Sequence, residues 1–235
     1  AMSTHFVIIV AAGTGSRLGG NLPKQFLQLD EKPILMHTLE KFAASQSNPQ
    51  IVLVLSEQMF ALWDELCKEF DFHIPHQVTK GGNSRFQSVK NGIEFIKGSP
   101  KLSQESKIAV HDGARPMVSS KLIDELYSTC SIDKPAVIPA VQSTNSVRMG
   151  NQDQNHAVDR QMVWLVQTPQ LFMSNLLIEA YEQPEENYFT DDASVVEKLS
   201  NNLYLLPGDQ QNLKITFEED IAIAQQLFNK IKRYL

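Results

Sequence analysis

The sequence is poor in the features that mark disulfide-stabilised, secreted or membrane-spanning proteins. Its 235 residues include only two cysteines, Cys67 and Cys130, and neither belongs to a CxxC pair. We therefore expect free thiols rather than a disulfide or a structural metal site. The longest apolar runs, Phe6–Ala12 and Ile51–Leu55, are too short to cross a bilayer, and no signal-peptide pattern is found. These absences predict a cytoplasmic protein.

Positive charge is also scarce. Lys and Arg number 21 against 27 Asp and Glu, which gives a formal net charge of −6. Such a chain is not expected to bind a nucleic-acid polymer or an anionic membrane by broad electrostatic attraction. A small anionic ligand is still compatible with this balance, because it needs only a local group of bases. With 42% apolar residues, the composition fits one globular α/β domain or at most two small ones.

What the sequence does contain is an alternation of strand-like and helix-like segments. Apolar and β-branched runs predict strands at Phe6–Val10, Ile51–Leu55, His73–Val78, Ile108–Val110, Ala136–Val141, Val163–Gln167, Leu203–Leu206 and Leu213–Thr216. Helical spacing predicts helices at Pro33–Ala44, Met59–Phe70, Asn83–Ile96, Leu122–Tyr127, Ser174–Tyr181, Asp191–Leu199 and Glu218–Ile231. This alternation is typical of a doubly wound, mostly parallel sheet.

The alternation stops between Gln142 and Arg160. This stretch is polar and contains only short β-like pieces, at Ser146–Met149 and His156–Val158. A hairpin that leaves the sheet explains the pattern, and exposed hairpins commonly contact a partner subunit. We therefore expect a single domain over residues 2–235 with a β-arm at about 142–161.

A glycine-rich segment directly follows the first predicted strand. Its sequence, AAGTGSRLGG, places Gly13 and Gly15 where backbone N–H groups can approach an anion closely. The segment contains one cation, Arg17, and a second cation, Lys24, follows it. A turn without a ligand would explain the glycines, and solvated surface charges would explain either cation separately. Their combination after a buried strand favours a polyphosphate site.

Two common phosphate-binding loops do not fit this segment. A P-loop requires Lys and then Ser or Thr after its last glycine, whereas Gly20 is followed by Asn21. A dinucleotide-binding loop requires a helix that opens at the last glycine, but the spacing is G-x-G-x-x-x-G and Pro23 follows closely. An NAD-dependent oxidoreductase is kept as an alternative, with Glu57 after the second strand as its ribose ligand.

The segment AAGTGSRLGGNLPKQF resembles the glycine-rich signature of the cytidylyltransferases that act on polyol phosphates. Further blocks resemble that family in the same order along nearly the whole chain: GGNSRFQSVKNG, HDGARP, DRQMVWLVQTPQLF, TDDAS and NLKIT. The resemblance implies a Rossmann-like three-layer α/β/α fold with a mostly parallel sheet and a protruding β-hairpin arm. It also implies a homodimer formed through the arm.

The resemblance assigns roles to individual residues. CTP would be bound by Ala11, Ala12, Gly13, Gly15, Gly82, Asn83, Ser88 and Gly113. The catalytic cations would be Arg17, Lys24 and Lys214, and the Mg²⁺ ligand would be Asp112. The polyol phosphate would be bound by Arg115 and Thr190, together with Thr144 and Arg160 from the arm of a second subunit.

Three parts of the sequence depart from the family pattern. Asn83 stands where family members usually carry an acidic residue; it still offers an acceptor for the cytosine amine, but without charge. The arm commonly has Asp-Thr-x-Lys, and residues 143–146 keep only Thr144 of these. Gly113 replaces the more usual Ala, which we expect to be harmless. The arm residues are therefore the assignments that depend most on the resemblance.

The chemistry can be argued from charge. A phosphate monoester is already an ionised nucleophile at pH 7, so its attack on a nucleoside triphosphate needs no covalent enzyme intermediate. The difficulty is to bring a dianion up to a tetra-anion, which requires cations, a metal and orientation. We therefore expect in-line attack on the α-phosphorus of CTP, with pyrophosphate as the leaving group.

Several alternatives are open at this point. HDGARP and DRQMVWLVQTPQLF look more like the branch of the family that acts on a methylerythritol phosphate than the branch that acts on ribitol 5-phosphate. A non-catalytic nucleotide-binding module is a further alternative. The segment Thr190–Asp192 also matches a helix N-cap with first-turn acids. A capping role for Thr190 is compatible with phosphate binding, because the free N–H groups at a helix start attract phosphate.

Overall fold

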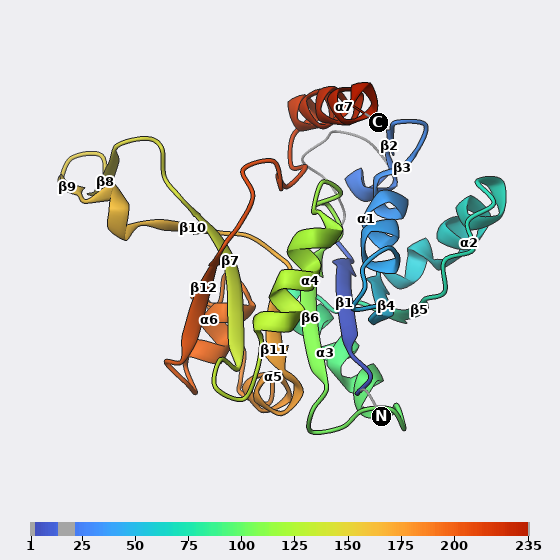
Figure 1. Ribbon diagram of the computed structural model, residues 1–235, viewed down its shortest axis with the longest axis horizontal. Helices are drawn as coiled ribbons and strands as arrows, with labels where there is room; N and C mark the ends of the chain where they lie inside the picture. Colours follow the sequence, from blue (N-terminus) through green and yellow to red (C-terminus); the bar gives the residue numbers. More distant parts are fainter. Residues whose placement is uncertain (1–2, 14–21, 235) are drawn as a thin grey trace.

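The computed structural model describes residues 3–13 and 22–234. Its main sheet has eight strands, of which seven follow the order β10-β7-β11-β6-β1-β4-β5 while β12 pairs with β7 (Figure 1). These strands are β1 (Phe6–Ala11), β4 (Gln50–Leu55), β5 (Gln77–Lys80), β6 (Lys107–Asp112), β7 (Ala136–Gln142), β10 (Trp164–Val166), β11 (Gln170–Met173) and β12 (Leu203–Pro207). Neighbours β6, β1, β4 and β5 run parallel. Strand β10 pairs antiparallel with β7, and β11 pairs antiparallel with both β6 and β7.

Helices cover both faces of this sheet and give the predicted three layers. One face carries α1 (Ile34–Ala43), α2 (Phe60–Glu69) and α4 (Ser120–Thr129). The other carries α3 (Arg85–Lys97), α5 (Ser174–Ala180) and α6 (Asp192–Glu197). Strand β1 explains the arrangement, because Val7 and Ile9 pack in the first cluster while Phe6 and Ile8 pack in the second.

Except for the 3₁₀ helix at Arg160–Met162, which lies beside the predicted arm, the remaining elements of the body lie near the edge at which the parallel strands end. The short 3₁₀ helices are η2 (Lys24–Phe26), η3 (Glu57–Met59) and η4 (Arg160–Met162), and β2 (Gln28–Leu29) pairs with β3 (Lys32–Pro33). The last helix, α7 (Glu218–Arg233), lies near this edge (Figure 1). It contributes Ala224 to a third apolar cluster with Leu29 and Ile215.

The predicted hairpin is present and forms a sheet of its own. Strands β8 (Val147–Gly150) and β9 (Asn155–Val158) pair only with each other and project from the body beyond β7 and β10 (Figure 1). Gly150 has a φ of 130° at the end of β8, and a Cβ there would lie 2.2 Å from the carbonyl oxygen of Gln154. The turn therefore requires glycine.

The structure corrects some of the predicted elements. Residues 213–216 are not a strand, although Ile215 donates its N–H to the Ala114 carbonyl over 2.8 Å. The strand predicted at His73–Val78 is found instead at Gln77–Lys80, since residues 73–76 make no ladder. Strand β11 was not predicted. Its four residues are too few to show a clear period, and its place between β6 and β7 is a tertiary feature.

The sequence expectations about thiols and membrane spans can be compared directly. Cys67 and Cys130 are free, the first half-buried and the second buried. Burial raises the pKa of Cys67 to about 11 and that of Cys130 to about 12, so both are thiols at neutral pH. Within residues 3–13 and 22–234, every helix is too short or too polar to cross a bilayer.

Candidate active site at the carboxyl edge of the sheet

A cavity of about 550 Å³ opens at the edge where the parallel strands end. It is lined by residues from segments far apart in the sequence: Val10, Ala11, Ala12, Gly13, Lys24, Gln25, Ser56, Gly82, Asn83, Ser84, Arg85, Ser88, Asp112, Ala114 and Lys214. This edge is where open α/β sheets place their ligands. The cavity therefore gathers most of the residues for which the sequence predicted a role.

Lys24 and Gln25 enter the cavity from the 3₁₀ helix η2. Gln25 is 3% exposed, and its Nε2 donates to the carbonyl oxygens of Ala11 over 2.6 Å and Gly13 over 3.2 Å. The backbone that begins the glycine-rich loop is therefore fixed by a buried side chain. Lys24 lines the cavity beside it. No role was predicted for Gln25, because its only signal in the sequence is its place next to Lys24.

The segment Gly81–Ser88 forms the opposite wall. Gly82 donates its N–H to the Oγ of Ser88 over 3.1 Å, and Ser84 caps α3 by accepting from the N–H of Gln87. Close packing explains Gly81, because a Cβ there would lie 2.4 Å from the Cβ of Ala12. The wall can therefore approach the end of β1 closely.

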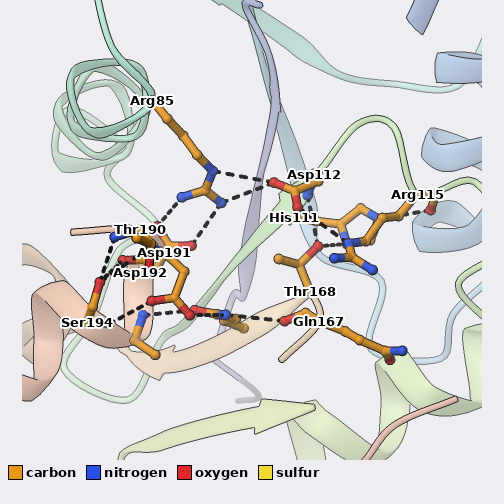
Figure 2. Close-up of polar contacts among 12 residues, drawn as sticks. Arg85, His111, Asp112, Arg115, Gln167, Thr168, Thr190, Asp191, Asp192 and Ser194 are labelled. Carbon is orange, nitrogen blue, oxygen red and sulfur yellow. Dashed lines mark hydrogen bonds and ion pairs between the residues drawn. The ribbon is translucent and has the colours of Figure 1, made fainter. Parts of the chain in front are cut away.

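Asp112 ends β6 and lies between two arginines. Its Oδ1 accepts from Nη2 of Arg85 over 3.2 Å, and its Oδ2 accepts from Nε of Arg115 over 3.4 Å (Figure 2). Arg85 also holds Asp192 with two bonds, Nη1 to Oδ1 over 3.2 Å and Nη2 to Oδ2 over 3.0 Å. Tyr181 donates its hydroxyl to the same carboxylate. Three elements, β6, α3 and α6, are thus joined by ion pairs beside the cavity.

The charge balance around Asp112 favours its ionised form. Burial by itself would raise the pKa of this carboxyl group, but the positive charges of Arg85, Lys214 and Arg115 hold it well below its ordinary value. For Arg85, burial acts to lower the pKa, and the charges of Asp192 and Asp112 more than compensate. Asp112 is therefore an anion throughout the physiological pH range.

His111 is fully buried on the strand next to Asp112. Its Nε2 lies 3.1 Å from the Arg115 carbonyl oxygen, which can only accept, so Nε2 carries the proton. Its Nδ1 therefore accepts from the Oγ of Thr168 over 2.9 Å, while that oxygen accepts from the N–H of Asp112 over 3.0 Å. Burial lowers the pKa of His111 to about 4, in agreement with a neutral ring that orients its neighbours.

Lys214 reaches the cavity from the segment that precedes α7. Asn212 donates from Nδ2 to the Thr168 carbonyl over 2.9 Å, and its own carbonyl accepts from Nη1 of Arg115 over 2.8 Å. Together with the Ile215 to Ala114 bond, these contacts fix the segment without a strand. Lys214 therefore lines the same cavity as Asp112, although the strand predicted around it is absent.

The structure separates the predicted site residues into groups. Those in the cavity are Ala11, Ala12, Gly13, Lys24, Gly82, Asn83, Ser88, Asp112 and Lys214. Gly113 is buried next to Ala11 and Leu35, where its carbonyl accepts from the hydroxyl of Thr38. Arg115 joins the site through Asp112. Gly15 and Arg17 lie outside the described residues.

Thr144 and Arg160 lie elsewhere, at the base of the arm. They line a second hollow with Gln142, Ser143, Gln161 and Gln210, and Arg160 donates from Nη1 to the Thr144 carbonyl over 3.1 Å. Neither residue lines the cavity at the sheet edge in the same chain. The arm therefore brings them together, but not beside Asp112.

The structure moves the predicted N-cap within residues 190–192 by one position. The N-cap of α6 is Asp191, which accepts from the N–H of Ser194, and Thr190 is an exposed residue before it (Figure 2). Asp192 lies in the first turn as predicted, but it is 0% exposed and paired with Arg85. No local signal distinguishes the two aspartates. Only the packing of α6 against α3 decides which one is buried.

Comparison with known proteins covers nearly the whole chain. The family profile of IspD, 2-C-methyl-D-erythritol 4-phosphate cytidylyltransferase, matches residues 5–230. The enzyme of that name from Phocaeicola vulgatus is 43% identical over 226 residues, covering 96% of this chain and 100% of the relative. That from Clostridium botulinum is 33% identical over 235 residues, covering 98% and 100%. The crystal structure of the Francisella tularensis enzyme is 29% identical with a TM-score of 0.76, covering 95% and 99%. The chain therefore belongs to the family of 2-C-methyl-D-erythritol 4-phosphate cytidylyltransferases.

Proposed function

We propose that this protein makes 4-diphosphocytidyl-2-C-methyl-D-erythritol and pyrophosphate from CTP and 2-C-methyl-D-erythritol 4-phosphate, a reaction of non-mevalonate isoprenoid biosynthesis. Family membership supports the reaction. The observation in the structure that carries it is one cavity in which Lys24, Lys214 and Asp112 converge with the glycine-containing walls. Such a cavity suits a nucleoside triphosphate, since it offers cations and close backbone approach in one place.

Charge is the main obstacle to this reaction, and the site is suited to overcome it. CTP carries up to four negative charges and the attacking phosphate two, so their approach is strongly opposed. Lys24 and Lys214 supply positive charge inside the cavity, and Arg115 lies behind Asp112. Arg17 is proposed to add a cation from the loop. The polyol phosphate would lie among Arg115, Thr190 and Lys214.

The proposed chemical step is an in-line displacement. An oxygen of the 4-phosphate attacks the α-phosphorus of CTP, and the bond from that phosphorus to the bridging oxygen of the β-phosphate breaks. The electron pair of that bond leaves with pyrophosphate. Lys24 and Arg17 stabilise the charge on the five-coordinate phosphorus, and no side chain needs to accept a proton. Ala11, Ala12 and Gly13 hold the triphosphate, while Gly82, Asn83 and Ser88 contact the base.

Mg²⁺ fits the donor set as an ion shared with the substrate. Within the described residues, no group of three or more His, Cys, Asp or Glu side chains could enclose a metal. Asp112 nevertheless offers an ionised carboxylate at the cavity wall, and Mg²⁺ is commonly held by one or two carboxylates plus phosphates and water. When bound there, Mg²⁺ would neutralise phosphate charge and fix the triphosphate conformation.

A second copy of the chain is proposed to complete the site. Thr144 and Arg160 lie at the base of the arm, away from the cavity of their own chain. Several large apolar side chains on and beside the arm are exposed, among them Met149, Met162 and Leu165. A homodimer through the arm would bury these side chains and present Thr144 and Arg160 to the partner's polyol phosphate.

Pyrophosphate release tests the proposed function. The purified protein is incubated with CTP, Mg²⁺ and 2-C-methyl-D-erythritol 4-phosphate, and parallel reactions contain ribitol 5-phosphate or no polyol phosphate. We expect release only with the methylerythritol substrate. Equal or faster release with ribitol 5-phosphate would contradict the substrate assignment. Binding of CTP without release would instead indicate a nucleotide-binding module.

A further inference from the structure

Arg85 is shared unequally between two carboxylates at the cavity wall. It binds both oxygens of Asp192, over 3.2 and 3.0 Å, in the side-by-side geometry that gives strong arginine–carboxylate pairs. It reaches only one oxygen of Asp112, over 3.2 Å from Nη2 and 3.4 Å from Nε. Figure 2 shows the guanidinium group between the two acids.

The two acids differ in what else they can bind. The Asp192 side chain has no exposed surface, and its third donor is the hydroxyl of Tyr181, so it is closed to any ligand. The Asp112 side chain is 14% exposed and lines the cavity. Asp192 thus does not touch a ligand itself. A buried aspartate without a partner would nevertheless be costly, so Arg85 is needed to pair with it.

The charges of the group balance as a set. Arg85 and Arg115 face Asp112 and Asp192, so two cations meet two anions. Without Asp192, Asp112 would face both arginines by itself, and Lys214 adds a further positive charge. A carboxylate neutralised in this way would attract a divalent cation only weakly.

We propose that Asp192 is a positioning residue that draws Arg85 away from Asp112, so that Asp112 keeps enough negative charge to bind a divalent cation. This inference rests on the proposed function, in which Asp112 binds Mg²⁺ with CTP. It assigns a role in metal affinity to a buried acid that does not touch the ligand.

Removal and restoration of charge separate this role from a merely structural one. Asp192→Asn is close in shape but leaves the full charge of Arg85 on Asp112. The double variant Asp192→Asn with Arg85→Gln removes both charges and leaves no buried ion unpaired. Tyr181→Phe is the matched control, because it removes one hydrogen bond from Asp192 without changing any charge. Its ring can remain stacked on Phe86.

The measurement is the Mg²⁺ concentration that gives half of the CTP-dependent rise in melting temperature, without polyol phosphate so that no turnover occurs. We expect Asp192→Asn to raise this concentration about tenfold and the double variant to return it to within about threefold of wild type. Tyr181→Phe should stay within about twofold. At saturating Mg²⁺, pyrophosphate release by Asp192→Asn should recover to within about threefold of wild type.

Three outcomes would overturn the inference. The first is an unchanged Mg²⁺ requirement in Asp192→Asn, and the second is a double variant that needs more Mg²⁺ than Asp192→Asn, as additive structural damage would produce. In both cases the proposed function is still supported if CTP and Mg²⁺ raise the melting temperature of the wild-type protein. The third is a wild-type protein with no Mg²⁺-dependent CTP shift, which would overturn the proposed function as well.

Discussion

The cavity at the sheet edge and the β-arm differ in how far their side chains are held by contacts within one chain. Around the cavity, Arg85, Asp112 and Asp192 come from three elements and are fixed by ion pairs. On and beside the arm, Met149 is 58% exposed, Met162 79% and Leu165 53%. The charged side chains beside the cavity are held in place within one chain, because they pair with one another. The arm has apolar surface that only something outside its own chain can cover.

Loss of a cavity cation is expected to give the largest effect and to leave the arm untouched. We expect Lys24→Ala to lower kcat by about 10²- to 10³-fold, because a preorganised positive group beside the reacting phosphates is lost. Steady-state pyrophosphate release measures this change. Lys68→Ala is the matched control, since Lys68 lies on α2 in an exposed pair with Asp64. Retention of more than about a tenth of wild-type kcat would exclude the transition-state role of Lys24.

Acid should destabilise the region around the cavity through His111. In the folded protein burial lowers the pKa of this ring to about 4, whereas its ordinary value is 6.5. The unfolded chain therefore binds an extra proton between these values. The contribution of His111 to stability is complete above about pH 6.5 and is lost as the pH falls toward 4, by about 3 kcal/mol.

Urea unfolding in the presence of EDTA from pH 7 to pH 4 measures this loss. The variant His111→Gln should remove that part of the pH dependence. His156→Gln is the control on the arm, because His156 is exposed and lies away from the cavity. If His111→Gln keeps the wild-type slope, the buried neutral ring is not its source.

The arm should respond to loss of apolar surface by dissociating. We expect Met162→Ser to weaken self-association by about 2 kcal/mol, or about thirtyfold, if this side chain is buried between subunits. Analytical ultracentrifugation measures the change. Ile132→Ser is the matched control, because Ile132 is 83% exposed but lies off the arm, before β7. Equal dissociation by both variants, or by neither, would contradict an interface at the arm.

The smallest effect is expected at Asn83, which is proposed to contact the base. Asn83 lines the cavity with a carboxamide, which can accept from the amine of cytosine or donate to the oxygen of uracil. A carboxylate can only accept. We expect Asn83→Asp to raise the ratio of kcat/KM for CTP over UTP by about fivefold. An unchanged ratio would show that Asn83 does not contact the base.

Much of the fold followed from local patterns. Strands β1 and β4 are continuous apolar runs, and the helices on both faces repeat with helical spacing, so the layers were predictable. Strand β11 and the extended segment around Lys214 were not. Both are short, and their structure depends on which neighbours they meet rather than on their own residues.

The candidate site divides in the same way. Lys24, Asp112 and Lys214 could be selected as candidate site residues because each lies in or beside a block that resembles the family. Arg85, His111 and Gln25 also lie in such blocks, but nothing in the sequence shows which side chains they contact. Their importance comes from contacts across the sheet edge, such as those from Arg85 to the ends of β6 and α6.

The sequence by itself determined the class of fold, the hairpin and the types of group available for phosphate chemistry. These properties depend on periodicity, glycine placement and charge, which are local. The tertiary structure decided that Asp191 caps α6 while Asp192 is buried against Arg85, and that Asp112 is left facing the cavity. Burial and ion pairing depend on distance in space, and residues 85, 112 and 192 meet only because the strands and helices that carry them pack at one edge of the sheet.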